Sequence, residues 1–176
     1  MRVTAVAGNP KPGSRTLDAA VMLAESIAPE ATVTEVDVIE LGAGLLGWGN
    51  NTVRAAVEKV AASDLVVFAS PTFKATYSGV MKLFLDQFAT GEGLRDVIAV
   101  PLMLGGGPSH AMAPELLLRP VLTELGAACP APGLYLLDNS YTTDGKIAEF
   151  VDRWGGVLTG TITAASSSPE RMAGSV

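Results

Sequence analysis

One segment of the chain, residues 8–16, combines the residue types that bind phosphate. A glycine turn precedes a helix-like stretch, and two cations and two hydroxyl side chains lie at the junction. Unpaired amides and the dipole at a helix N-terminus favour an anion, and hydroxyls and cations add further donors. We therefore expect a terminal phosphomonoester to be bound by four residues: Lys11, Ser14, Arg15 and Thr16.

This segment fits neither of two common nucleotide-binding patterns. Gly13 is followed by Ser14 and Arg15, where a Walker A loop needs a Lys-Ser/Thr pair, and the spacing is not G-x-G-x-x-G. A purely structural alternative is that Ser14 only caps a helix after a proline-rich turn. Phosphate binding and helix capping are therefore both open at this position.

A second segment, residues 70–79, is suited to a planar ligand because it places two aromatic residues between an apolar strand and a helix. Pro71 stiffens the turn, and the backbone amides of residues 72–75 can reach the polar edge of a ring, with Phe73 packed near it. The alternative is that Phe73 and Tyr77 are ordinary packing residues.

The third segment contains three consecutive glycines, Gly105, Gly106 and Gly107. Glycine permits close backbone approach and positive φ, so the main chain can lie against a flat ligand, although a plain connector explains the pattern as well. His110 follows at a helix start, where we expect capping or packing rather than catalysis. Cys129 is expected to be a small buried residue.

Apolar strand-like and helix-like segments alternate along the chain and must position these three loops. We expect strands at 3–7, 33–39, 65–69, 97–104 and 134–137, and helices at 14–28, 52–62, 80–88, up to 125, and 145–158. This alternation predicts a doubly wound α/β domain, a parallel sheet between two helix layers, with the ligand beyond the carboxyl ends of the strands. We expect one domain over residues 1–163 and a flexible tail over residues 164–176.

Composition excludes several function classes. The chain has 176 residues, 48% hydrophobic residues and a net charge of −6, which disfavours nonspecific binding to nucleic acid or anionic membranes. One cysteine and one histidine leave no zinc or iron cluster. Apolar runs are too short to span a bilayer and no export signal is visible, so a cytoplasmic location is expected.

The loop motifs together resemble the NAD(P)H-dependent FMN reductase family. The first carries Gly8-Asn9-Pro10-Lys11 with Ser14-Arg15-Thr16, and the second runs Pro71-Thr72-Phe73-Lys74-Ala75-Thr76-Tyr77-Ser78-Gly79. The third reads Gly105-Gly106-Gly107-Pro108-Ser109-His110 and is followed by Leu118-Arg119-Pro120-Val121-Leu122. Flavin reductases of two-component alkanesulfonate monooxygenase systems share this combination.

The resemblance implies a flavodoxin-like fold with strand order 2-1-3-4-5, FMN at the edge of a homodimer or homotetramer, and hydride transfer from NADPH or NADH. It also implies that reduced flavin is supplied to a monooxygenase. No catalytic acid or base is expected, because the cofactors perform the hydride transfer. The expected FMN-binding residues are Asn9, Lys11, Ser14, Arg15, Thr16, Pro71, Thr72, Phe73, Lys74, Ala75, Tyr77, Gly105, Gly106 and Gly107.

Leu116 leaves alternatives open. Relatives that release flavin carry an aromatic residue or histidine near residues 115–117, together with a π-bulge, whereas this chain has Leu116. A quinone or azo reductase with retained FMN is therefore a second hypothesis. A flavodoxin-like electron carrier and an interaction module without flavin are the others.

Overall fold

The computed structural model describes residues 1–166 and contains a five-stranded parallel sheet in the order β2-β1-β3-β4-β5. This is the flavodoxin-like order, so the predicted fold and strand order are confirmed. The strands are β1 (Val3–Ala7), β2 (Val33–Asp37), β3 (Leu65–Pro71), β4 (Ile98–Gly105) and β5 (Leu134–Leu137).

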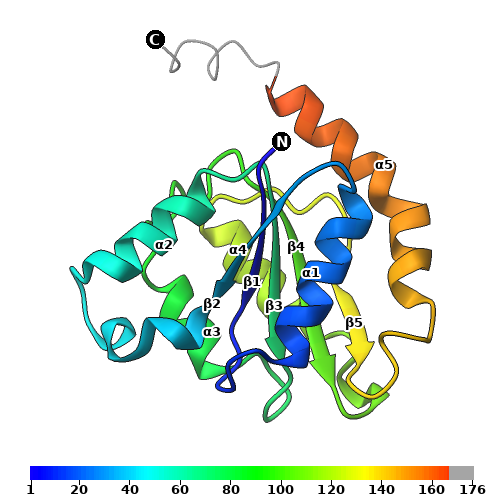
Figure 1. Ribbon diagram of the computed structural model, residues 1–176, viewed down its shortest axis with the longest axis horizontal. Helices are drawn as coiled ribbons and strands as arrows, with labels where there is room; N and C mark the ends of the chain where they lie inside the picture. The colour runs from blue at the N-terminus through cyan, green and yellow to red at the C-terminus, as the bar shows by residue number, and fades with distance from the viewer. Residues whose placement is uncertain (167–176) are drawn as a thin grey trace.

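The central strands form the core because both of their faces are covered. Every residue of β1, β3 and β4 is buried, which explains their continuous apolar sequences. Helices α1 (Arg15–Ile27) and α5 (Lys146–Ser166) pack on one face of the sheet. Helices α2 (Asn51–Ala61), α3 (Gly79–Leu85) and α4 (Arg119–Glu124) lie on the other, which gives the three layers seen in Figure 1.

Several predicted boundaries are wrong, including the ends of the second strand and of the last helix. The second strand ends at Asp37 rather than at residue 39, because the chain turns into 3-10 helical turns, η1 (Val38–Leu46), with Gly42 at φ +56° between them. The last helix continues to Ser166 instead of ending near residue 158, so residues 164–166 of the expected tail are helical. Residues 167–176 of that tail lie outside the described residues.

A π-helix, η3 (Pro114–Leu118), follows a short 3-10 turn, η2 (Pro108–His110), and runs directly into α4. Its wide turn is closed by the Arg119 amide, which donates to the Pro114 carbonyl. Pro120 explains this geometry, since proline has no N–H to donate and its ring would clash with the Leu116 carbonyl in a regular α-helix. The π-helix therefore forms here without the aromatic residue or histidine of the relatives.

The register of the sheet brings the ends of its strands to one edge. Ala7 pairs with Asp37 on one side and with Ala69 on the other, Pro71 pairs with Leu104, and Gly105 pairs with Leu137. The loops that leave these carboxyl ends therefore meet, at the lower edge of the sheet in Figure 1.

Gly8, directly after β1, is required by the close approach of α3. A Cβ atom placed there would lie 2.4 Å from the Met81 Cβ and 2.7 Å from the Met81 Cα. We predict that Gly8→Ala lowers the free energy of unfolding by about 1–3 kcal/mol, measured by urea denaturation.

Gly156→Ala is the matched control for this substitution. Gly156 lies in α5 with no atom within 4 Å of an added Cβ. Because alanine favours a helix more than glycine does, this control should be more stable by up to about 1 kcal/mol. Equal stabilities for the two variants would contradict the steric explanation.

Candidate functional site

A cleft of about 480 Å³ opens at the carboxyl edge of the sheet, where the loops after β1, β3, β4 and β5 meet. Its lining mixes small backbone-exposing residues, hydroxyls and charged groups. The lining residues are Asn9, Pro10, Lys11, Gly13, Arg15, Thr16, Pro71, Thr72, Phe73, Leu104, Gly105, Gly106 and Asp138.

The structure brings together most, but not all, of the residues expected at the site. Nine of them line the cleft, namely Asn9, Lys11, Arg15, Thr16, Pro71, Thr72, Phe73, Gly105 and Gly106. Five of them do not line it, namely Ser14, Lys74, Ala75, Tyr77 and Gly107. Asp138 is the charged lining residue that sequence reasoning missed, although its place directly after the fifth predicted strand was an available signal.

The first loop is held in shape by its own side chains. The Asn9 amide nitrogen donates to the Thr16 hydroxyl over 2.8 Å, and the Asn9 side-chain oxygen accepts from the Lys11 amide over 2.9 Å. Ser14 is the N-cap of α1, its hydroxyl oxygen accepting from the Leu17 amide over 3.4 Å. The capping alternative for Ser14 is thus observed, and its buried hydroxyl lies behind the cleft wall.

Asp37, at the end of β2, holds the same loop by a hydrogen bond to its backbone. Its Oδ2 accepts from the Gly13 amide over 2.9 Å, and Gly13 has a φ of +57° that glycine adopts without strain. The other carboxylate oxygen, Oδ1, is buried and has no hydrogen-bond partner in the structure. Asp37 therefore fixes the turn that precedes α1.

Arg15 spans the cleft from the start of α1 to the residue after β5. Its Nη1 donates to the Asp138 carbonyl oxygen over 2.8 Å, and its Nη2 lies 3.3 Å from the Asp138 carboxylate Oδ2. The Arg15 side chain is 62% exposed, so it can also reach a ligand in the cleft.

The second loop contains a strained hairpin turn, residues 73–76, beside the cleft. The Phe73 amide donates to the Thr76 carbonyl over 2.8 Å, and the Thr76 amide donates back over 3.2 Å. Between them Lys74 and Ala75 have φ of 53° and 69°, a conformation that costs a non-glycine residue about 1–2 kcal/mol. The turn makes Phe73 a half-exposed wall of the cleft.

The donors of this loop differ from those expected. The Thr72 amide donates to the Leu104 carbonyl over 2.6 Å, and the Phe73 amide is used in the turn. Within residues 1–166, the amides of Lys74 and Ala75 have no acceptor. Tyr77 packs against the core beneath α3, so the packing alternative holds for Tyr77 and not for Phe73.

Two buried serines anchor the base of the hairpin. The Ser70 hydroxyl accepts from the Ser78 amide over 2.9 Å, and the Ser78 hydroxyl donates to the Gly8 carbonyl. Ser78 also caps α3 by accepting from the Met81 amide over 3.0 Å. The first and second loops are therefore joined through Ser78.

Thr72, a residue of the cleft wall, carries a buried polar atom without a partner. Its hydroxyl oxygen is buried and has no hydrogen-bond partner, although Thr72 lines the cleft wall. A buried hydroxyl without a partner is costly, and native proteins normally pair such groups. The Thr72 hydroxyl is therefore a polar atom behind the cleft surface that the protein leaves unpaired.

Gly105 and Gly106 line the cleft, and the space around Gly105 adds a packing reason for glycine. None of the three glycines of the third loop has a positive φ. A Cβ at Gly105 would lie 1.9 Å from the Tyr135 hydroxyl oxygen, and that hydroxyl donates to the Gly107 carbonyl over 2.7 Å. Gly105 therefore makes room for Tyr135, which holds the loop beside the cleft.

Comparison with known proteins identifies the family to which the chain belongs and supports its fold. The family model of the NADPH-dependent FMN reductases matches residues 1–142. The chain belongs to this family. A solved structure of an NADH:FMN oxidoreductase in its apo form is similar over 96% of this chain and 92% of that chain, with a TM-score of 0.81 and 24% identity.

Curated relatives share this family relationship at low identity. An FMN reductase (NADPH) from Pseudomonas putida is 32% identical over 94 residues, which cover 52% of this chain and 47% of that protein. The chain thus matches about half the length of this relative. The NADH-dependent FMN reductase SfnF from Pseudomonas putida is 29% identical over 143 residues, covering 77% of this chain and 76% of SfnF.

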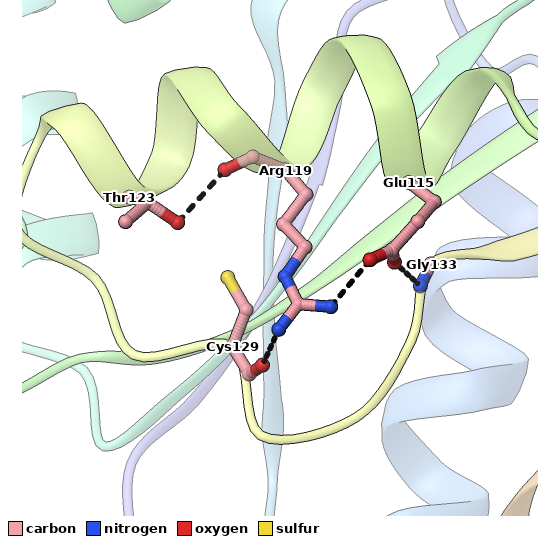
Figure 2. Close-up of polar contacts among 5 residues, drawn as sticks. All are labelled: Glu115, Arg119, Thr123, Cys129 and Gly133. Carbon is pink, nitrogen blue, oxygen red and sulfur yellow. Dashed lines mark hydrogen bonds and ion pairs between the residues drawn. The ribbon is translucent and has the colours of Figure 1, made fainter.

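Away from the cleft lining, the π-helix and α4 are fastened to the segment before β5 by a polar clamp, shown in Figure 2. The Arg119 guanidinium donates to Glu115 Oε1 over 2.6 Å and to the Cys129 carbonyl over 2.8 Å. The second carboxylate oxygen of Glu115 accepts from the Gly133 amide over 2.7 Å. Gly133 must be a glycine because an added Cβ would lie 2.7 Å from the Glu115 amide.

Two residues singled out in the sequence lie outside the cleft. His110 is exposed at the end of η2. Cys129 is buried, as expected, and this burial raises the pKa of its thiol to about 11, so it is a poor nucleophile at neutral pH. Within the described residues no His/Cys/Asp/Glu group is arranged to hold a metal, and no helix is long and apolar enough to cross a bilayer.

We predict that Glu115→Ala lowers the free energy of unfolding by about 1–3 kcal/mol, because it leaves Arg119 Nη1 and the Gly133 amide without their acceptor. Urea denaturation measures this effect. The control is Glu58→Ala, which breaks another i,i+4 ion pair, the one between Glu58 and Arg54. The Glu58 side chain is 71% exposed and that of Arg54 is 65% exposed, whereas the Glu115 side chain is 28% exposed. The control should change stability by less than about 0.5 kcal/mol. A loss as small as this in Glu115→Ala would show that the clamp contributes little.

Proposed function

We propose that the protein is an NAD(P)H-dependent FMN reductase that binds FMN in the cleft at the carboxyl edge of the sheet. The single observation that carries the proposal is the convergence of the three loops on one cleft in a chain of the FMN reductase family. When bound, FMN would accept hydride from the nicotinamide ring at its flavin ring. The protein has to bind and orient the two ring systems.

One end of the cleft is suited to the FMN phosphate. Lys11 and Arg15 supply positive charge, and Thr16 supplies a hydroxyl group. The first amides of α1 lack intrahelical acceptors and add the favourable end of the helix dipole. Ser14 contributes by shaping this helix start rather than by lining the cleft.

The other end of the cleft is suited to the flavin ring. Phe73 offers an apolar face, and Gly105 and Gly106 expose backbone. We propose that the buried Thr72 hydroxyl, which has no partner in the protein, pairs with the polar ring edge when FMN binds. The amides of Lys74 and Ala75, at the tip of the hairpin next to Phe73, are further donors that we propose the ring edge can reach. Phe73 is 48% exposed, which leaves an open side where the nicotinamide ring would stack.

The proposal includes an assembled state and a partner. Met112, Leu116 and Leu117 are exposed around a mostly apolar hollow beside the hairpin, and we infer that this face is covered in a homodimer or homotetramer. The resemblance to two-component systems supports a flavin-dependent monooxygenase as the recipient of reduced flavin. Because the reaction consumes NADPH or NADH, we propose a cytoplasmic location.

Flavin titration and steady-state kinetics test the proposal. We expect the purified protein to quench FMN fluorescence on binding and to oxidise NADPH or NADH when FMN is in excess. Turnover only with a quinone or azo acceptor would support a reductase with retained flavin, and flavin binding without turnover would support an electron carrier. Absence of flavin binding would refute the proposal.

Thr72→Val tests the ring end of the cleft. Its hydroxyl has no partner in the protein, so the substitution should leave the free energy of unfolding unchanged or raise it by up to about 1 kcal/mol. Loss of a donor to the ring should weaken FMN and riboflavin binding equally, by about 3- to 10-fold. Fluorescence titration with both flavins measures this. Unchanged affinity for both flavins would remove Thr72 from the site.

A further inference from the structure

The proposed function has the cleft bind a phosphate group, and Asp138 places a negative charge in that same cleft. Among the residues that line the cleft, the charged ones are Lys11, Arg15 and Asp138, so the lining carries a net charge of +1. An FMN phosphate carries about two negative charges at neutral pH. The carboxylate of Asp138 therefore opposes the ligand that the two cations attract.

Asp138 also pairs with Arg15, the lining cation whose chemistry suits phosphate better than that of Lys11. Arginine binds phosphate with two parallel donors, and two nitrogens of Arg15 already face Asp138, one at 2.8 Å from its carbonyl oxygen and one at 3.3 Å from its carboxylate. A phosphate in the cleft must therefore share the Arg15 guanidinium with Asp138.

We propose that Asp138 is a positioning residue that competes with the flavin phosphate for Arg15 and so keeps FMN binding weak and exchange fast. This inference rests on the proposed function, since it assigns a role at the same cleft. It gives a reason, independent of the residue at position 116, for flavin to behave as a substrate that leaves after reduction.

Asp138→Asn separates the charge of this residue from its other contact. The Asp138 carbonyl still accepts from Arg15 Nη1, because that contact belongs to the backbone. Removing the carboxylate should lower the Kd for FMN by about 3- to 10-fold and slow FMN dissociation, with the gain shrinking at high salt. Binding of riboflavin, which lacks the phosphate, should change by less than about 2-fold.

Two further variants make this test specific. Asp86→Asn removes an ion-paired carboxylate from the C-cap of α3, outside the cleft lining, with the same change in net charge. This variant should bind both flavins like the unsubstituted protein. Arg15→Gln removes the contested cation, so adding Asp138→Asn to it should recover less FMN affinity than Asp138→Asn gains alone.

The outcomes distinguish this inference from the function on which it rests. Stronger FMN binding with unchanged riboflavin binding in Asp138→Asn supports the inference. Unchanged or weaker FMN binding, or an equal gain in the Arg15→Gln background, overturns it and leaves the proposed function standing. No flavin binding by the unsubstituted protein overturns both. Circular dichroism of each variant confirms the fold, and Asp138→Ser replaces Asp138→Asn if the latter does not fold.

Discussion

The alignment of parallel strand ends is the constraint on which the rest of the structure depends. Ala7, Ala69 and Asp37 stand side by side in one register, and the buried residues of β1 and β3 make a slip of that register costly. Because the ends coincide, segments more than 60 residues apart in the chain form one cleft. The loops contribute the chemistry, and the sheet determines that they meet.

Contacts between the loops then set the shape of that cleft. Gly8 lets α3 approach the end of β1, and Ser78 joins the two segments through its hydroxyl group. On the other side, Tyr135 fills the space that Gly105 leaves and holds the third loop. Gly8, Ser78 and Tyr135 lie outside the list of expected ligand-binding residues, yet the position of each wall depends on them.

The α/β class could be predicted from the sequence because buried parallel strands and amphipathic helices leave strong local patterns, whereas the strand order came from the family resemblance. The cleft could be predicted in outline for the same reason, since Lys11, Arg15 and Phe73 follow strands at the expected edge. Features set by distant contacts could not. The tight space at Gly105 depends on Tyr135, and the pairing of Arg15 depends on Asp138, so neither is visible in a local sequence window.

The turn at Lys74 and Ala75 shows how a wall of the cleft can depend on residues that do not line it. Left-handed backbone at two residues with a Cβ is a conformation that an unrestrained segment abandons. It persists here because the hydrogen bonds of Phe73 with Thr76, and of Ser70 with Ser78, close the loop at two levels. If either closure is loosened, the segment relaxes and carries the Phe73 ring away from the cleft. This wall of the cleft is thus held by hydrogen bonds at two depths, one set in the exposed turn and one between buried serines.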